Sequence, residues 1–265
     1  MGHYDTIRDT TPWLAYASWI WEILRRNPDY ISYYASLKNK GLQTKIIGEN
    51  TPLICAAQGF PTANTFGLLY PVDPKLDAGE GHAFWHPDVL AAAVRFHKVD
   101  ESDIDRRDKP IQLSKFPAQQ THFLGADGSY HIRFLGRNFW FQMQCDGISD
   151  VGENVYVGLE NNRVIGFDKR LKTQAEIYGI YDNSIDIDTP LHVPSRMASY
   201  QKSMIAYDIR QGGGSLSTIV SAFLEAGLIE KNTDEFKDYN HHAKNALKRA
   251  KAFIYGDYLK FLRRQ

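Results

Sequence analysis

Apolar and aromatic residues recur at steps of three and four near the N-terminus, and this spacing predicts helices. A first helix is expected over residues 13–26, because Asn27-Pro28 should end it. A second short helix should follow over 30–37. Residues 88–99 have a similar spacing and also predict a helix.

The middle of the chain changes to short runs rich in β-branched and aromatic residues. Three strands are expected over 131–135, 139–145 and 155–159, and a further strand over 163–167. Because turn-forming residues such as Gly, Asp and Asn separate these runs, we predict an antiparallel meander.

Helical spacing returns after residue 195. Helices are expected over 196–210 and 216–225, with Gly212-Gly213-Gly214 between them and Ser215 as the cap of the second. A third helix should begin near Thr233 and continue toward the terminus. Three helices with tight, glycine-containing connections are typical of a helix-turn-helix unit.

These patterns predict an α+β fold with three regions. They are an N-terminal helical region (1–40), a β-rich antiparallel middle that would serve assembly (41–190), and a C-terminal helix-turn-helix variant (191–265).

Composition favours a folded protein and excludes several classes. Hydrophobic residues make up 43% of the 265 residues and charged residues 23%. The sequence contains no run of 18 apolar residues, so no membrane span is expected. The first residues also lack the apolar run of a signal peptide. Two cysteines, Cys55 and Cys145, are too few for a disulfide framework, so we expect reduced thiols and a cytoplasmic location.

Charge is distributed unevenly, although 31 basic residues balance 31 acidic residues over the whole chain. Residues 195–265 hold twelve Lys and Arg against seven Asp and Glu, so an anionic partner would prefer this quarter. Between Ala243 and Ile254, apolar residues follow one helical face and Lys244, Lys248 and Lys251 lie beside it. This pattern predicts a helix that enters the major groove of DNA, although a solvated surface helix would have the same appearance.

In a helix-turn-helix the helix before the reader crosses the DNA backbone, which is the role expected of residues 216–225. Hydroxyl groups at its start would suit a phosphate; alternatively Ser215 is only a cap, and the two roles are compatible. Arg249 is the expected bidentate donor to a base, and the cations at the terminus would add unspecific attraction. The expected DNA contacts are Ser215, Ser217, Thr218, Lys244, Lys248, Arg249, Lys251, Lys260, Arg263 and Arg264.

Two strings carry a resemblance to a known family. The run Trp21-Glu22-Ile23-Leu24-Arg25-Arg26-Asn27-Pro28-Asp29-Tyr30 resembles the short regulator-like domain that often precedes a RovC-type DNA-binding domain. Met204-Ile205-Ala206-Tyr207-Asp208-Ile209-Arg210, with Lys248-Arg249-Ala250, resembles that DNA-binding domain itself. The resemblance implies a transcriptional activator of type VI secretion genes that binds double-stranded promoter DNA as a homo-oligomer, and specifically as a hexamer.

The N-terminal aromatic cluster has two interpretations. Trp13, Trp19 and Trp21 are expected in the core, as dense aromatics usually are. Alternatively, together with Arg25 and Arg26, they form a contact with another subunit or with RNA polymerase, because Trp and Arg are favoured at interfaces.

No enzyme, metal or cofactor is expected. His82 and His86 lack a third ligand, and Asp182, Asp186 and Asp188 lack the rest of a calcium loop. The alternative function is a protein-binding antiactivator that sequesters another regulator through the helix-turn-helix surface. A cationic stripe on the last helix favours DNA, and an exposed apolar stripe would favour a protein partner.

Overall fold

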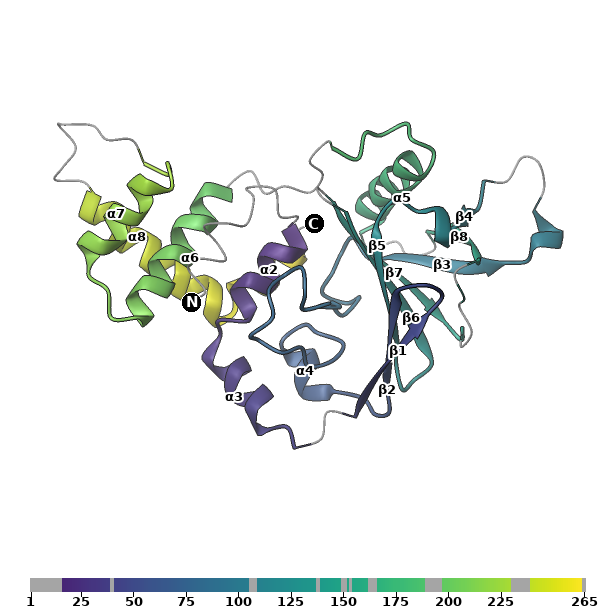
Figure 1. Cartoon of the computed structure of the whole chain (residues 1–265), viewed down its shortest axis with the longest axis horizontal. Coiled ribbons are helices and arrows are strands. Elements are labelled where there is room, and N and C mark those ends of the chain that lie inside the picture. The colour runs from purple at the N-terminus through teal and green to yellow at the C-terminus, as the bar shows by residue number, and fades with distance from the viewer. Residues whose placement is uncertain are drawn as a thin grey trace.

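The C-terminal helices lie at one end of the molecule and the sheet, with one helix packed on it, lies at the other, with the N-terminal helices between them (Figure 1). The computed structural model describes residues 16–38, 41–104, 109–136, 139–148, 152, 154–161, 166–188, 197–229 and 239–263. The α+β fold class is confirmed.

The predicted strands over 131–135 and 139–145 pair antiparallel as expected, but the strand over 155–159 pairs with residues 94–99 and 111–112, so the predicted meander is only partly correct. All of these strands belong to one sheet of eight. Its order is β1-β2-β5-β6-β7-β3-β8-β4, and β5, β6 and β7 pair antiparallel as consecutive neighbours. The sheet as a whole is mixed, because β2 pairs parallel with β5 and β3 parallel with β7. The strands are β1 (Leu42–Ile47), β2 (Thr51–Ala56), β3 (Val94–Val99), β4 (Ile111–Gln112), β5 (Gln119–Leu124), β6 (Ser129–Leu135), β7 (Trp140–Asp146) and β8 (Tyr156–Glu160).

Both faces of this sheet are covered. Alternate residues of β6 face opposite ways, and Tyr130, Ile132 and Phe134 join a core cluster with Ile177 and Ile180 of helix α5 (Phe167–Tyr181). The other face packs against the segment between β2 and β3 and a second core cluster. Helix α5 was not predicted, and a strand was expected over 163–167 instead. Residue Phe167 begins the helix, and residues 163–165 lie outside the described part.

The predicted helix over 88–99 is wrong. Residues 88–93 make only turns, and Val94–Val99 is strand β3. Val94 and Phe96 alternate into the core, and the strand pairs with β7 on one side and β8 on the other. These pairings override the local helical spacing.

The predicted terminal helices are confirmed where the structure describes them. The first helix ends at Leu24, and Asn27 caps the second, because its side chain accepts hydrogen bonds from the backbone N–H groups of Asp29 and Tyr30. Short 3₁₀ turns occur at Glu101–Asp103 and Leu113–Lys115. The remaining helices are α2 (Tyr16–Leu24), α3 (Pro28–Ser36), α4 (Pro61–Thr65), α6 (Met197–Gln211), α7 (Leu216–Glu225), α8 (Tyr239–Ala252) and α9 (Tyr258–Leu262), and a kinked segment (Phe253–Asp257) joins the last two.

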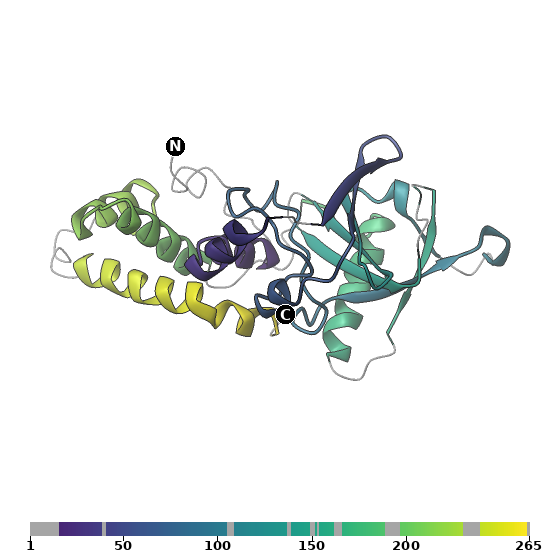
Figure 2. The ribbon, with the colours of Figure 1, turned by 90° about the horizontal axis from the view of Figure 1, so that it is seen from below.

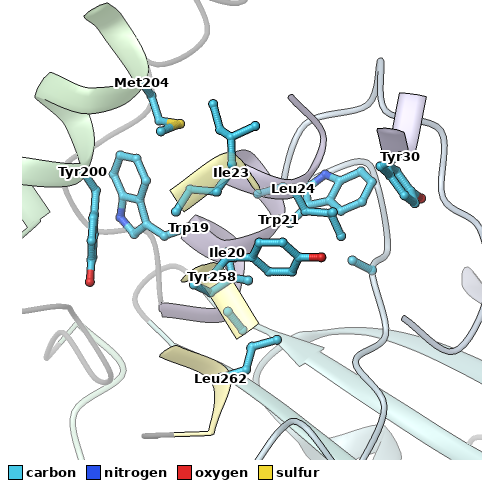
Figure 3. Close-up of a cluster of buried hydrophobic side chains, with 14 of the residues drawn as sticks. Trp19, Ile20, Trp21, Ile23, Leu24, Tyr30, Tyr200, Met204, Tyr258 and Leu262 are labelled. Atoms are coloured by element: carbon cyan, nitrogen blue, oxygen red, sulfur yellow. The ribbon is translucent and has the colours of Figure 1, made fainter. Parts of the chain in front are cut away.

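The two ends of the chain share one core. Trp19 of α2 lies beside Tyr200 of α6, with ring centroids 6.3 Å apart, and close to Met204 (Figure 3). A polar contact also joins the two ends of the chain, since the Asn27 side chain donates to the carbonyl of Ile254 at 2.7 Å. The N-terminal helix is therefore packed together with the C-terminal helices rather than as a separate region.

Gly67 lies in a turn that packs against α9. Replacing it with alanine would cost stability in two ways, through backbone strain and through overpacking. Its φ is +82°, and an added Cβ would lie 2.9 Å from Leu259 Cδ2. Gly128 has the same φ of +82°, with open space around an added Cβ. We expect Gly128→Ala to lower the free energy of unfolding by about 1–2 kcal/mol through backbone strain. Gly67→Ala should cost about 1–3 kcal/mol more through overpacking. Urea unfolding of both variants measures the difference, and equal losses would contradict the close packing of α9.

Candidate nucleic-acid interface

Helix α8 has one buried face made mainly of small residues. Ala243, Ala246 and Ala250 are fully buried, and Tyr239 begins the same face. Because alanine side chains let helix backbones approach closely, α8 packs along α6 and also touches α7. The apolar steps found in the sequence are thus the packing face.

The opposite face of α8 is exposed and cationic. Lys244, Lys248, Arg249 and Lys251 are all exposed, and the helix contains no acidic residue. Among the residues that the structure describes, none forms an ion pair with these four side chains. Figure 2 shows α8 along one side of the helical end, with α6 and α7 on the other side. The face is therefore open along its length.

Part of this charge has a structural explanation. Arg249 and Lys251 lie in the last turn of α8, where cations interact favourably with the helix dipole. Lys244 and Lys248 precede that turn and gain little from the dipole, because the effect fades beyond the last turn. Their position on a face without acids is what a polyanion would recognise.

The structure adds a fifth cation that the sequence analysis missed. Lys202 of α6 lies near Arg249, and burial together with the Arg249 charge lowers the pKa of its ammonium group. Two cations held close to each other strengthen the positive field at this end of the helix pair. Only the packing of α6 on α8 brings them together, so no sequence spacing could have shown it.

The hydroxyl groups at the start of α7 are used within the chain. Ser215 caps the helix by accepting from the Thr218 N–H, and Thr218 returns a contact to the Ser215 backbone. Ser217 also lies within hydrogen-bond distance of Ser215, at 2.6 Å between the two hydroxyl oxygens. The cap interpretation is confirmed, and all three side chains remain exposed.

The helix connections differ in length. Four residues, 212–215, join α6 to α7, as expected for a tight turn. Residues 226–238 join α7 to α8, a connection longer than a helix-turn-helix turn, and 230–238 lie outside the described part. Helix α7 contains no basic residue and one acid, Glu225, so the positive charge of this helix pair is concentrated on α8.

The terminal cations are less available than those of α8. Lys260 of α9 donates to Asp257 at 2.6 Å, which neutralises part of its charge. Arg263 is exposed at the end of α9, and Arg264 lies outside the described residues.

The aromatic cluster belongs to the core. Trp19, Trp21 and Arg25 are 1% exposed and Arg26 is 4% exposed, so these side chains offer no surface to a partner. Figure 3 shows Trp19 and Trp21 among buried side chains from both ends of the chain. The interface interpretation is therefore corrected for these four residues, and Trp13 lies outside the described part.

A second polar cluster lies on the sheet, away from α8. Thr121, Arg133 and Gln142 stand side by side on β5, β6 and β7. The Gln142 amide bonds both the N–H and the carbonyl of Trp85, and Arg133 Nη2 lies 2.6 Å from His82 Nδ1. This row fastens the segment between β2 and β3 to the sheet, which is a structural role.

No group of three or more His, Cys, Asp or Glu side chains in the described ranges could hold a metal ion. In the same ranges, no helix is both long and apolar enough to cross a membrane. Neither the scan against protein-family models nor the search of curated proteins finds a match for this sequence.

Proposed function

We propose that this protein binds double-stranded DNA through the exposed face of α8 and acts as a transcriptional regulator. The observation that carries the proposal is the row of four exposed cations on a helix without acids. Phosphate contacts by Lys and Arg supply most of the affinity of proteins for DNA. The resemblance to RovC-type regulators supports an activator of type VI secretion genes that works as a homo-oligomer, since several basic helices side by side would multiply a weak single contact.

The exposed face of α8 also discriminates against the alternative of a protein-sequestering antiactivator. That function would need an apolar stripe on the outer face of the helix. The outward positions hold Asn240, His241, Asn245 and the cations, with Ala252 as the one apolar residue of α8 among them. The charge pattern therefore favours DNA over a protein partner.

Lys244→Ala tests the proposal. The full chain should bind a fluorescent duplex of about 40 base pairs with an affinity that falls steeply between about 50 and 200 mM salt. Removal of one phosphate contact should reduce the slope of log affinity against log salt by about 0.9. Fluorescence anisotropy measures both quantities.

Lys172→Ala is the matched control. Lys172 is an exposed lysine of α5, at the sheet end of the molecule, and its replacement changes net charge equally. This variant should keep the wild-type slope. If both lysine variants changed the slope equally, the interaction would follow net charge and the assignment to α8 would be wrong.

A further inference from the structure

The exposed face of α8 divides into a central ridge and two flanks. At 3.6 residues per turn, positions 241, 245, 248 and 252 fall on one line, opposite the buried alanines. All four residues are exposed. We call this line the outward ridge: His241, Asn245, Lys248 and Ala252.

Cations stand on both sides of this ridge. The same geometry puts Lys244 and Lys251 on one flank and Arg249 on the other, where Lys202 of α6 lies nearby. A helix in the major groove lies between two phosphate backbones, so its flanks meet phosphates and its ridge meets base edges. The distribution of side chains on α8 matches this division.

Asn245 is the ridge residue that protein stability does not explain. Asparagine is a poor former of helix interiors, because its amide competes with the backbone for hydrogen bonds. In the described part of the chain the Asn245 side chain makes no hydrogen bond and faces solvent. An unpaired amide at the centre of a cationic face fits an external ligand with a donor next to an acceptor.

Adenine presents such a pair in the major groove, since its N6 amino group donates and its N7 accepts. Lys248 lies three residues farther along the ridge, a rise of about 4.5 Å, and guanine O6 and N7 are the acceptors that a lysine prefers. Ala252 follows with only a methyl group, which allows close approach of the helix to the bases.

We propose that Asn245 recognises an adenine and Lys248 a guanine within two base pairs of it, while Lys244, Lys251 and Arg249 bind the phosphates on either side. This inference rests on the proposed DNA binding. It assigns base recognition to Asn245 and changes the role of Arg249 from a base contact to a backbone contact.

Selection from a pool of duplexes with a randomised centre tests the assignment, using the full chain. The wild type should enrich sites with an adenine and a guanine within two base pairs. In defined duplexes, substitution of that adenine should weaken wild-type binding about 5- to 150-fold, the range of a bidentate base contact. Asn245→Ala should lose this discrimination and keep the wild-type salt slope. Alanine is the better helix former, so this variant should fold.

Asn240→Ala is the control, because Asn240 is an exposed asparagine of the same helix that lies off the ridge. It should retain the adenine preference. Retention of the preference by Asn245→Ala would overturn the assignment. Salt-dependent binding by the wild type without any base preference would also overturn it and leave DNA binding intact. Absence of binding to any duplex at about 50 mM salt would overturn both proposals.

Discussion

The protein should lose stability steeply between pH 6.5 and pH 4, because buried histidines must remain neutral while it is folded. Burial lowers the pKa of His122 from 6.5 to about 4. Burial likewise lowers the pKa of His131 to about 4, and the carboxylates of Asp127 and Asp146 only partly oppose it. Both rings are almost fully buried, at 2% and 1% exposure.

The direction follows from proton binding. Below pH 6.5 the unfolded chain protonates both rings and the folded chain does not, so acid favours unfolding. Each ring should lower the free energy of unfolding by about 1.4 kcal/mol per pH unit in this interval. At pH 4 the loss should reach about 3 kcal/mol for each ring. Above pH 6.5 this dependence should vanish.

Urea unfolding followed by tryptophan fluorescence at several pH values measures the slope. His122→Gln should reduce the slope near pH 5 by about 1.4 kcal/mol per pH unit, because the variant carries one fewer ring to protonate. His241→Gln is the control, since that ring is in solvent in both states. An unchanged slope in His122→Gln would show that other groups govern acid unfolding.

Glu22→Gln should lower the free energy of unfolding by about 3–5 kcal/mol, the usual result of removing one partner from a buried ion network. One oxygen of Glu22 accepts from Arg25 Nε at 2.7 Å and from Arg26 Nη1 at 2.8 Å. The other accepts from the Ala78 N–H at 2.9 Å. A glutamine would turn an NH₂ group toward donors and remove the carboxylate that pairs with Arg25 and Arg26, while Arg26 would keep its ion pair with Asp208.

The carboxylate is charged over the physiological range. Burial alone would raise the pKa of Glu22, but the charges of Arg26 and Arg25 outweigh it and hold the pKa below the ordinary 4.5. The contribution of Glu22 is therefore present above pH 4.5 and is lost as pH falls further. Measurement at pH 7 isolates it from the histidine effect.

Asp257→Asn is the matched control for Glu22→Gln. Asp257 pairs with Lys260 at 2.6 Å, which is as short as the ion pairs of the Glu22 network, but both partners are partly in solvent. Its loss should cost less than about 1 kcal/mol. If both variants lost the same free energy of unfolding, burial would add nothing to the contribution of the Glu22 ion pairs, and the prediction would be wrong.

Sequence patterns predicted those elements in which the apolar residues recur with the same period as the buried positions. The alanine and leucine steps of α8, the Ser215 cap and the β-rich runs of β6 and β7 are local properties, and each was recovered. The cationic face was recovered for the same reason, because lysines at helical spacing opposite a buried stripe are visible in the sequence.

Elements defined by distant partners escaped prediction. In α5 the apolar residues lie on both faces, since Phe167 and Leu171 are about half exposed while Ile177 and Ile180 are buried, so no single period stands out. The local sequence of β3 favours a helix, but the segment forms a strand because it pairs with β7 on one side and β8 on the other. Lys202 joins the site only through the packing of α6 on α8.

The ion pair between Arg26 and Asp208 spans 182 residues of chain, with both bonds at 2.8 Å. A ribosome adds about 5–20 residues per second, so roughly 10–40 s separate the synthesis of its two partners. During that interval Trp19 emerges without Tyr200 and Met204, and Arg26 without its aspartate. Trp19 and Arg26 thus remain without these partners until α6 is made, and nascent chains stalled before α6 should be the species that chaperones retain.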